Sequence, residues 1–238
     1  MQTEDESQAA VARWFDATYR ERGFGYLRPF EAYPIYLQML DARPGEALLD
    51  VGCGAGHVLR AAAQRGLFAA GADLSRRGLA LARGYVPSAA LVQANGEQLC
   101  FADHSFDLVV SIGVLERFLH PERALSEMAR VARPGARLCL MVRNSLDPRW
   151  LVWTRWRHRA AEHGHHGART LEAWRRLFLG SGFTVDAVHG DQWPRQRLRR
   201  LVRLGRAPAL GAEPIARPWL PLGLAPEFIF VLRKGTGA

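Results

Sequence analysis

The chain has 238 residues, of which 48% are hydrophobic, so it is long enough for one well-packed domain and short for two. No run approaches the roughly 20 apolar residues needed to cross a bilayer, and the acidic N-terminus is unlike a secretory signal, so we expect a cytoplasmic protein. The net charge of +9 would suit nucleic acid or an anionic membrane, but Lys234 is the only lysine, and the abundance of Arg, Ala, Leu and Gly is typical of a GC-rich genome. Three scattered cysteines form neither a disulfide framework nor a zinc-type pair.

Short β-type runs alternate with helical patterns through the middle of the chain, after an N-terminal portion to about residue 42 that reads as helical. We expect strands at residues 46–51, 68–73, 90–92, 106–110 and 137–142. We expect helices at residues 57–64, 76–83 (with Ser75 as the N-cap) and 121–131, and a turn at 133–135. Beyond residue 142 the expected order is a Trp/Arg-rich helix, a His/Gly loop, a helix at 170–179, and strands at 183–188 and 227–232.

This alternation predicts the fold class, because strands separated by helices form a parallel, doubly wound sheet with helices on both faces. We expect an α/β, Rossmann-like sheet of seven strands, mostly parallel with an antiparallel last strand. Helices of the N-terminal portion should lie outside this core, and residues 190–226 should form a helical lid insertion between the last two strands.

A glycine-rich loop, Gly52-Cys53-Gly54-Ala55-Gly56, follows the first predicted strand. Closely spaced glycines let the backbone approach a ligand and present free N–H groups at the start of a helix. NAD enzymes use a similar loop, but their spacing is G-x-G-x-x-G rather than G-x-G-x-G. Asp50 precedes the first glycine, where a carboxylate suits an ammonium group and suits pyrophosphate poorly. The loop therefore favours a ligand with an amino acid end over a dinucleotide.

Polar residues also follow the second and third predicted strands. Asp73 lies about twenty residues beyond the glycine loop, where a carboxylate can accept hydrogen bonds from both hydroxyls of a ribose. Asn95 could bond an adenine amino group, and the N–H of Gly96 could reach a ring nitrogen. Amino acid, ribose and base are thus marked in order along one edge of the sheet.

With these residues in place, the chain resembles a class I methyltransferase dependent on S-adenosylmethionine (SAM), of the large family that includes ubiquinone and menaquinone biosynthesis enzymes. The resemblance covers about residues 45–142. The matching segments occur in the family's order and are residues 48–56, 70–75, 95–101, 105–110, 113–116 and 129–135. On this resemblance the chain is one methyltransferase domain, 1–238, made of an N-terminal helical segment (1–44), a SAM-binding core (45–142), a helical acceptor-side segment (143–182) and the last two strands with their lid (183–238).

The resemblance also implies which residues contact SAM and its product S-adenosylhomocysteine. At the methionine end these are Asp50, Gly52, Cys53, Gly54 and Gly56. At the ribose and the adenine they are Asp73, Leu74, Asn95, Gly96 and Glu97, and beside the sulfonium Ser111 and Ile112. Two positions depart from the family pattern. Asn95 stands where Asp is usual, which keeps an acceptor, and Arg117 stands where many relatives have His, which puts an inherited acid/base role there in doubt.

Candidate catalytic residues lie on the acceptor side. Glu116 and His120 follow the fourth predicted strand, at the edge of the sheet where ligands bind, although Glu116 could equally pair with an arginine and His120 could be solvated. His166, with His163 and His165, lies in a glycine-containing loop and could serve as a base. No carboxylate or cysteine completes a familiar metal spacing around these histidines, so we expect no metal.

Two further segments could shape the acceptor site. Trp150, Trp153 and Trp156 share one helical face and either pack on the sheet or form an aromatic wall. The Arg195–Arg206 helix, within the lid, is either solvated, in contact with an anionic membrane, or bound to an acidic group of the acceptor.

These observations predict metal-independent methyl transfer from SAM to a small, apolar or aromatic metabolite, such as a natural product or a quinone-like compound, by in-line displacement. Nucleic acid is a less favoured partner, because only the charge supports it. Two alternatives remain: methylation of a macromolecule such as RNA, and a catalytically silent SAM-binding protein that serves as a partner. The sequence indicates neither the acceptor atom nor the oligomeric state.

Overall fold

The computed structural model describes residues 4–147, 167–191 and 221–235. Three expected features fall outside these ranges: the three tryptophans at 150–156, the histidines at 163–166, and the Arg195–Arg206 helix. No helix in the described ranges combines the length and the apolar character that a bilayer crossing requires.

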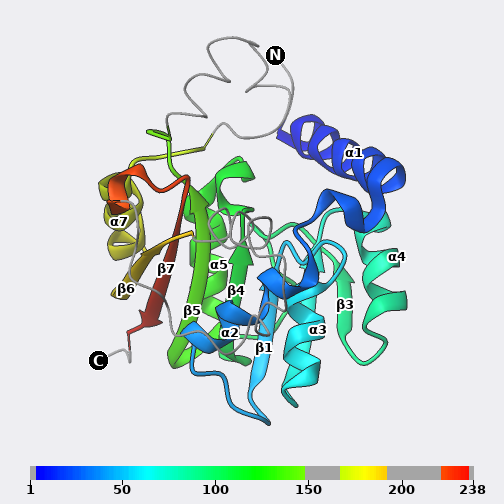
Figure 1. Ribbon diagram of the computed structural model, residues 1–238, viewed down its shortest axis with the longest axis horizontal. Coiled ribbons are helices and arrows are strands. Elements are labelled where there is room, and N and C mark those ends of the chain that lie inside the picture. The colour runs from blue at the N-terminus through cyan, green and yellow to red at the C-terminus, as the bar shows by residue number, and fades with distance from the viewer. Residues whose placement is uncertain (1–3, 148–166, 192–220, 236–238) are drawn as a thin grey trace, which may run out of the picture.

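A seven-stranded sheet in the order β3-β2-β1-β4-β5-β7-β6 forms the centre of the molecule (Figure 1). Its strands are β1 (Ala47–Val51), β2 (Phe68–Asp73), β3 (Ala90–Gln93), β4 (Phe106–Ile112), β5 (Ala132–Arg143), β6 (Phe183–Gly190) and β7 (Glu227–Lys234). The first five strands are mutually parallel, whereas β7 is antiparallel to both β5 and β6. The predicted fold class is therefore confirmed, including the antiparallel final strand.

Helices precede the sheet and connect its strands. The N-terminal portion contains α1 (Glu4–Arg22), the short 3-10 helices η1 (Gly23–Tyr26) and η2 (Phe30–Ala32), and α2 (Pro34–Met39). The later helices are α3 (His57–Gln64), α4 (Arg76–Tyr85), η3 (Leu115–Arg117), α5 (Pro121–Val131), α7 (Leu171–Gly180) and η5 (Leu222–Leu224). Ser75 caps α4, as predicted, because its side chain accepts a hydrogen bond from the N–H of Gly78.

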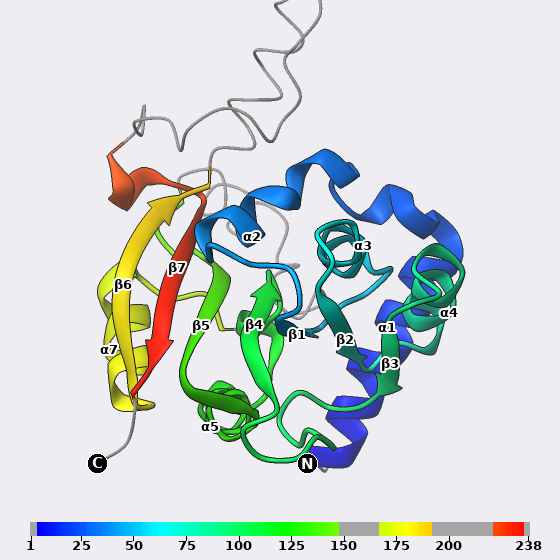
Figure 2. The same cartoon turned by 90° about the horizontal axis from the view of Figure 1, so that it is seen from below.

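The sheet separates two layers of buried hydrophobic residues. Figure 2 shows helices on both sides of the strands, with α2 and α3 on one side and α5 on the other. Alternate residues of each strand point to opposite faces, so Leu49 and Val109 contribute to one layer and Leu48 and Leu108 to the other. Helices α5 and α7 cover the first face, and α2, α3 and α4 cover the second. With both faces buried, the functional site has to lie at an edge of the sheet.

The start of β5 differs from the sequence prediction. Residues 133–135, expected as a turn, belong to a strand that begins at Ala132. Ala132 pairs with Phe106, whereas Arg137 pairs with Leu108, so the register shifts between these pairs. Gly135 has a φ of 75°, which accommodates this irregularity. The Pro-Gly pair therefore produces a distortion within the strand rather than a break before it.

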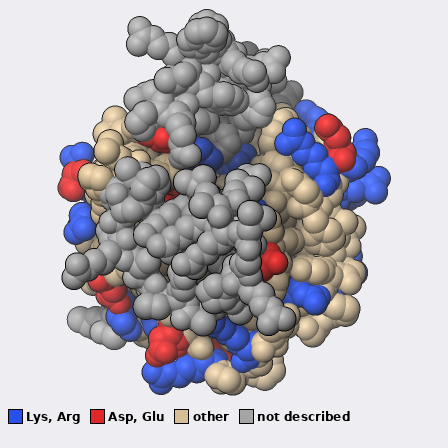
Figure 3. Space-filling model, in the orientation of Figure 1, with Lys and Arg blue, Asp and Glu red and all other residues tan. Residues whose placement is uncertain are grey.

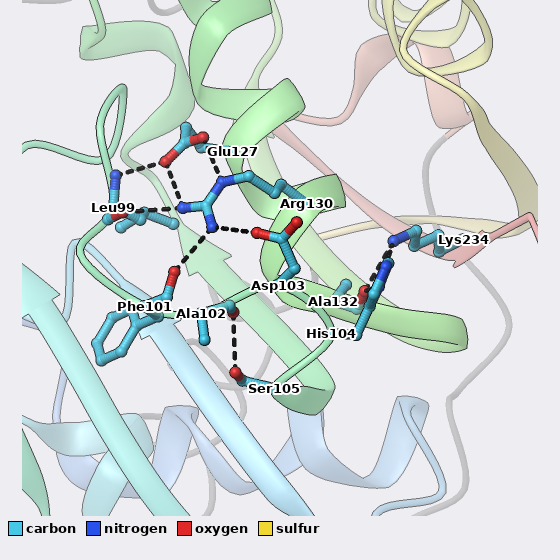
Figure 4. Close-up of polar contacts among 10 residues, drawn as sticks. All are labelled: Leu99, Phe101, Ala102, Asp103, His104, Ser105, Glu127, Arg130, Ala132 and Lys234. Atoms are coloured by element: carbon cyan, nitrogen blue, oxygen red, sulfur yellow. Dashed lines mark hydrogen bonds and ion pairs between the residues drawn. The ribbon is translucent and has the colours of Figure 1, made fainter.

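Arg130, near the end of α5, fixes the loop that follows β3 (Figure 4). Its guanidinium donates to the carbonyl oxygens of Leu99 (2.9 Å) and Phe101 (2.8 Å) and to the carboxylate of Asp103 (2.7 Å). Glu127 orients the guanidinium and also accepts from the N–H of Leu99 at 2.7 Å. Arg130 therefore ties the end of α5 to residues 99–103 of this loop. The same loop carries Asn95 to Glu97 a few residues earlier.

Candidate active site

A cavity of about 380 Å³ opens at the carboxyl ends of the parallel strands. Residues at or just beyond the carboxyl ends of β1, β2, β3, β4 and β5 line it, and so do residues of the N-terminal segment. Its lining includes Phe15, Tyr19, Tyr26, Arg28, Tyr33, Gly52, Asp73, Leu74, Gly96, Ile112, Gly113, Glu116, Arg117, Phe118, Met141, Arg143 and Glu227. This volume and position are typical of a small-molecule site in a doubly wound fold.

The glycine loop joins β1 to α3 and is held by Asp73. Gly52, Gly54 and Gly56 have φ values of 81°, 50° and 86°, which other residues rarely adopt. The Asp73 carboxylate accepts from the N–H of Gly54 and from the N–H of Ser75, each at 2.7 Å. One side chain therefore links the loop after β1 to the start of α4.

The two acidic residues at this edge differ in their environment. Asp73 lines the cavity, and burial raises its pKa, partly offset by its two N–H donors. Asp50 is only 2% exposed and does not line the cavity, and burial, reinforced by the nearby Asp73, raises its pKa strongly. Asp73 is thus placed to meet a ligand directly. The predicted contact of Asp50 with an ammonium group stays a prediction.

The segment after β3 forms a compact turn. Asn95 accepts from the N–H of Glu97 at 3.0 Å, and Glu97 in turn accepts from the N–H groups of Leu119 (2.8 Å) and His120 (3.2 Å). Gly96 lines the cavity, and a Cβ there would lie 2.5 Å from the ring of Phe118. Both polar side chains therefore shape the turn, while Ala94 and Gly96 lie on the cavity wall.

The remaining predicted cofactor residues fall into two groups. Gly52, Leu74 and Ile112 line the cavity. Ser111, by contrast, is fully buried and donates to the carbonyl oxygen of Val51 at 2.9 Å, which ties β4 to β1. Cys53 is buried beside Gly71, and burial raises the pKa of its thiol. Contacts of these last two residues with SAM stay predictions.

Of the three candidate catalytic residues, Glu116 is the one that the structure brings to the cavity. It is 1% exposed, and burial raises its pKa, while Arg117 and Arg143 act in the opposite direction. Its carbonyl oxygen accepts from the N–H of Gly167 at 3.0 Å, and a Cβ on Gly167 would lie 2.7 Å from that oxygen. His120 precedes α5 and is not part of the lining, and His166 lies outside the described residues.

Arg117, the departure from the family pattern, interacts with the N-terminal helix. Its Nε donates to the carbonyl oxygen of Gly113 at 3.0 Å, and its guanidinium lies 5.2 Å from the ring centre of Phe15 and 6.0 Å from that of Trp14. Cation–π contacts of this kind stabilise the docking of one element on another. Arg117 therefore attaches α1 to the end of β4.

Charged residues from distant parts of the chain form the end of the cavity beyond Glu116, where the sequence predicts the acceptor (the acceptor end). Arg28, which follows η1, donates through both Nη atoms to Asp191 (3.0 and 2.9 Å) and also to Glu227. Arg143, at the end of β5, donates to the other oxygen of Glu227 at 3.1 Å. We call these four residues the Arg28 network. Negative and positive charges alternate through the network in the order Asp191, Arg28, Glu227, Arg143. Arg28, Arg143 and Glu227 line the cavity.

Sequence reasoning missed the Arg28 network and the aromatic residues of the N-terminal segment. Phe15, Tyr19, Tyr26 and Tyr33 all line the cavity, although none belongs to a recognisable motif. Arg28 and Asp191 are 163 residues apart, so no local pattern could pair them. The only signal in advance was that the segment before β1 reads as helical.

The residues present fit the cofactor that the resemblance implies. A carboxylate able to accept from a ribose lies on the cavity wall beside a glycine loop whose backbone is open to close approach. A Cβ on Gly52 would lie 2.5 Å from Val114, so this wall has no room for a larger residue. The cavity then extends past Ile112 to Glu116 and the Arg28 network, which leaves space for a second molecule.

Comparison with known proteins agrees with this geometry. Residues 49–140 match the family model described as "Methyltransferase domain". The ubiquinone biosynthesis O-methyltransferase of Hahella chejuensis is 37% identical over 134 residues, which cover 53% of this chain and 54% of that protein. The demethylmenaquinone methyltransferase of Corynebacterium glutamicum is 44% identical over 130 residues, or 54% of each chain. The chain thus spans about half the length of the curated relatives it matches.

Solved structures share the fold over more of the chain. A Burkholderia thailandensis 1,6-didemethyltoxoflavin-N1-methyltransferase, solved with that compound and S-adenosylhomocysteine bound, has a TM-score of 0.67 and 17% identity, and the match covers 99% of this chain and 92% of that one. A SAM-dependent methyltransferase from Mesorhizobium loti has a TM-score of 0.64 and 21% identity, covering 86% and 98%. Residues 49–140 therefore match a methyltransferase domain, and over about half of its length the chain is a distant relative of the ubiquinone and menaquinone enzymes.

Proposed function

We propose that this protein transfers the methyl group of SAM to a small molecule bound in the same cavity. The observation that carries the proposal is the continuity of that cavity. One end has Gly52 and Asp73, the residues expected at the cofactor, and the other end has Glu116 and the Arg28 network. A donor and an acceptor bound at these two ends would meet near Ile112 and Gly113.

Methyl transfer from SAM depends mainly on how the protein positions the acceptor. Bound SAM supplies a methyl group on a good leaving group, which the acceptor displaces in line. The cavity walls hold the acceptor in line and exclude water, which are the main contributions that an enzyme makes to such a reaction. When the acceptor is a hydroxyl or an amine, the Glu116 carboxylate can take up the proton that this group releases.

The lining supports an aromatic acceptor that also has a polar group. Phe15, Tyr26, Tyr33 and Met141 offer apolar and aromatic surface, which favours a planar ring. The Arg28 network next to them offers both donors and acceptors. Of the apolar or aromatic metabolites expected from the sequence, a purely apolar one fits this end less well than a ring with a polar substituent.

A macromolecular acceptor receives less support. In Figure 3 basic and acidic side chains lie next to each other at several places around the described part of this face. A nucleic acid site is normally a basic surface of one sign. The cavity, moreover, has the volume of a small-molecule site.

Thermal unfolding with SAM, S-adenosylhomocysteine or NADH tests the cofactor. A ligand at 100 times its dissociation constant stabilises by about 2.7 kcal/mol, or roughly 5–10 °C for a chain of this size. A shift with both SAM compounds and none with NADH is expected, and no shift with either SAM compound would contradict the proposal.

Labelled SAM then tests the acceptor class. The protein is incubated with the small-molecule fraction and, separately, with the RNA fraction of a bacterial extract. We expect label in small molecules. Label in RNA alone would overturn the acceptor class, and cofactor binding without transfer to either fraction would favour the catalytically silent alternative.

A further inference from the structure

Tyr19 of α1 occupies an unusual place at the cofactor end of the cavity. The residue lines the cavity and is only 6% exposed. A Cβ on Gly54 would lie 2.1 Å from its hydroxyl oxygen, and one on Gly78 would lie 3.0 Å from its ring. The phenol is therefore wedged between the glycine loop and the first turn of α4, and both neighbours have to be glycine to admit it.

Contacts one turn earlier hold α1 in this position. Asp16 accepts from the hydroxyl of Ser75 at 2.6 Å and from the N–H of Arg77 at 3.1 Å. An acidic side chain at the N-terminus of α4 is favourable because the free N–H groups there carry partial positive charge. Figure 1 shows the resulting arrangement, with α1 beside α4. The position of Tyr19 is thus determined by the contacts that hold α1 against α4.

The Tyr19 hydroxyl makes no hydrogen bond with any residue in the described part of the chain, although the ring is packed against Tyr26 with the ring centres 5.5 Å apart. A phenol hydroxyl both donates and accepts hydrogen bonds, so one without a protein partner that borders a cavity is available to a ligand there. Burial, with Asp73 nearby, raises the pKa of this phenol, so it remains protonated and able to donate. The cavity beside it is the place where a partner can bind.

The position of the hydroxyl indicates which part of a ligand it would meet. Asp73 accepts from the N–H of Gly54 at 2.7 Å, and the Tyr19 oxygen lies against the Cα side of the same glycine. The carboxylate and the phenol therefore flank a single residue and can reach the same small polar group. We propose that Tyr19 is a cofactor-binding residue whose hydroxyl bonds the ribose that Asp73 is expected to hold. This inference depends on the proposed function.

The experiment compares two ligands on the Tyr19→Phe variant. S-adenosylhomocysteine contains the ribose and the amino acid, whereas 5′-methylthioadenosine contains the ribose and lacks the amino acid. Titration calorimetry should show both ligands binding roughly three- to tenfold more weakly to the variant, as expected for the loss of one hydrogen bond. Tyr85→Phe is the matched control, because Tyr85 is the last residue of α4 and is not part of the cavity lining. The affinities of this variant for both ligands should equal those of the wild type.

Each result decides between distinct explanations. If the wild-type protein fails to bind S-adenosylhomocysteine, the proposed function itself is wrong. If the wild type binds and Tyr19→Phe binds each ligand with the wild-type affinity, the cofactor role of Tyr19 is overturned. A loss confined to S-adenosylhomocysteine would overturn the ribose assignment and move the contact to the amino acid end. Unliganded variants should unfold at the wild-type temperature, since the phenylalanine ring keeps the packing.

Discussion

The two ends of the cavity are built in different ways. At the cofactor end, the loop after β1 is held by Asp73, only 19 residues beyond Gly54, and the contacts are mostly between a side chain and backbone N–H groups. At the acceptor end, the Arg28 network joins residues that are 84 to 199 positions apart, and its contacts are between side chains. The first end is a local strand–loop–helix unit, and the second exists only in the complete fold.

This difference has a physical consequence for specificity. Backbone N–H groups and glycines at the cofactor end present the same chemistry in any sequence that keeps the loop, which suits a ligand common to a whole family. Side chains contributed by separate elements can be exchanged one at a time without disturbing that loop. Under the proposed function, the acceptor end is therefore where proteins that share the cofactor end can differ in substrate.

The largest expected effect is on catalysis by Glu116. For a hydroxyl or amine acceptor, Glu116→Gln should lower kcat by about a hundredfold or more, as expected for loss of a general base. Because burial raises its pKa, the wild-type rate should fall as the pH decreases through a value above the ordinary 4.5, and the variant should lack that limb. Transfer of labelled methyl to the acceptor found in the extract screen gives both readouts.

The unfolding temperature of Glu116→Gln distinguishes a catalytic role of Glu116 from a structural one. A carboxyl group whose pKa is raised in the folded state destabilises the fold when ionised, so Glu116→Gln should unfold at the same or a higher temperature than the wild type at pH 7. Glu122→Gln, which removes an exposed carboxylate paired with Arg169, is the control and should retain activity. Equal activity of both variants would mean that Glu116 is no base.

The second effect concerns the acceptor end as a structural unit. Arg28→Ala leaves Asp191 and Glu227 without their shared partner and should destabilise the fold by about 2–4 kcal/mol, lowering the unfolding temperature by roughly 5–12 °C. Arg43→Ala, which breaks an ion pair whose side chains are 71% and 75% exposed, should unfold close to the wild-type temperature, because solvent screens such a pair. Similar unfolding temperatures for the two variants would show that the Arg28 network is dispensable to the fold.

The third effect concerns the cofactor end. Asp73→Ala should weaken binding of S-adenosylhomocysteine by about 1.5–3 kcal/mol, because it removes a charge-assisted acceptor from the cavity wall. Titration calorimetry measures the affinity, and Asp186→Ala, which removes a surface partner of Arg233, is the control. Unchanged affinity in Asp73→Ala would refute the placement of the ribose at this residue.

The smallest effect is the pH dependence of stability that His57 confers. His57, at the start of α3, is packed among the rings of Phe24, Tyr33 and Tyr85, and burial lowers its pKa from 6.5 to about 4. The unfolded chain then binds the proton more readily, so this residue costs stability as the pH falls from about 6.5 towards 4. The wild type should lose on the order of 1–2 kcal/mol more than His57→Leu between pH 7 and pH 4.5. Parallel stability curves for the two proteins would contradict this assignment.

Sequence patterns predicted the sheet and the local structure of the glycine loop well, because both depend on short-range information. The glycine loop, the strand that ends at Asp73 and the Ser75 cap each lie within a few residues of the structure they determine. The start of β5 was misread because a Pro-Gly pair normally signals a turn, whereas here pairing with β4 incorporates it as an irregularity.

The acceptor end could not be predicted for the opposite reason. Nothing near Arg28 distinguishes it from the other arginines of an arginine-rich chain, and its partners are at the far end of the sequence. Tyr19 was hidden in a similar way, because its role depends on how α1 lies across Gly54 and Gly78. Contacts of this kind are determined by the packing of elements and not by the periodicity of any one of them.

The span of the Arg28 network also governs the order in which the protein can assemble on the ribosome. Arg28 is synthesised early, but its partners Asp191 and Glu227 emerge 163 and 199 residues later. Because chains fold progressively from the N-terminus during synthesis, β1 to β4 and the glycine loop can form while Arg28 still lacks both carboxylates. A nascent chain therefore passes through a stage that has the cofactor end and lacks the acceptor end, and only the pairing of β7 with β5 and β6 completes the site.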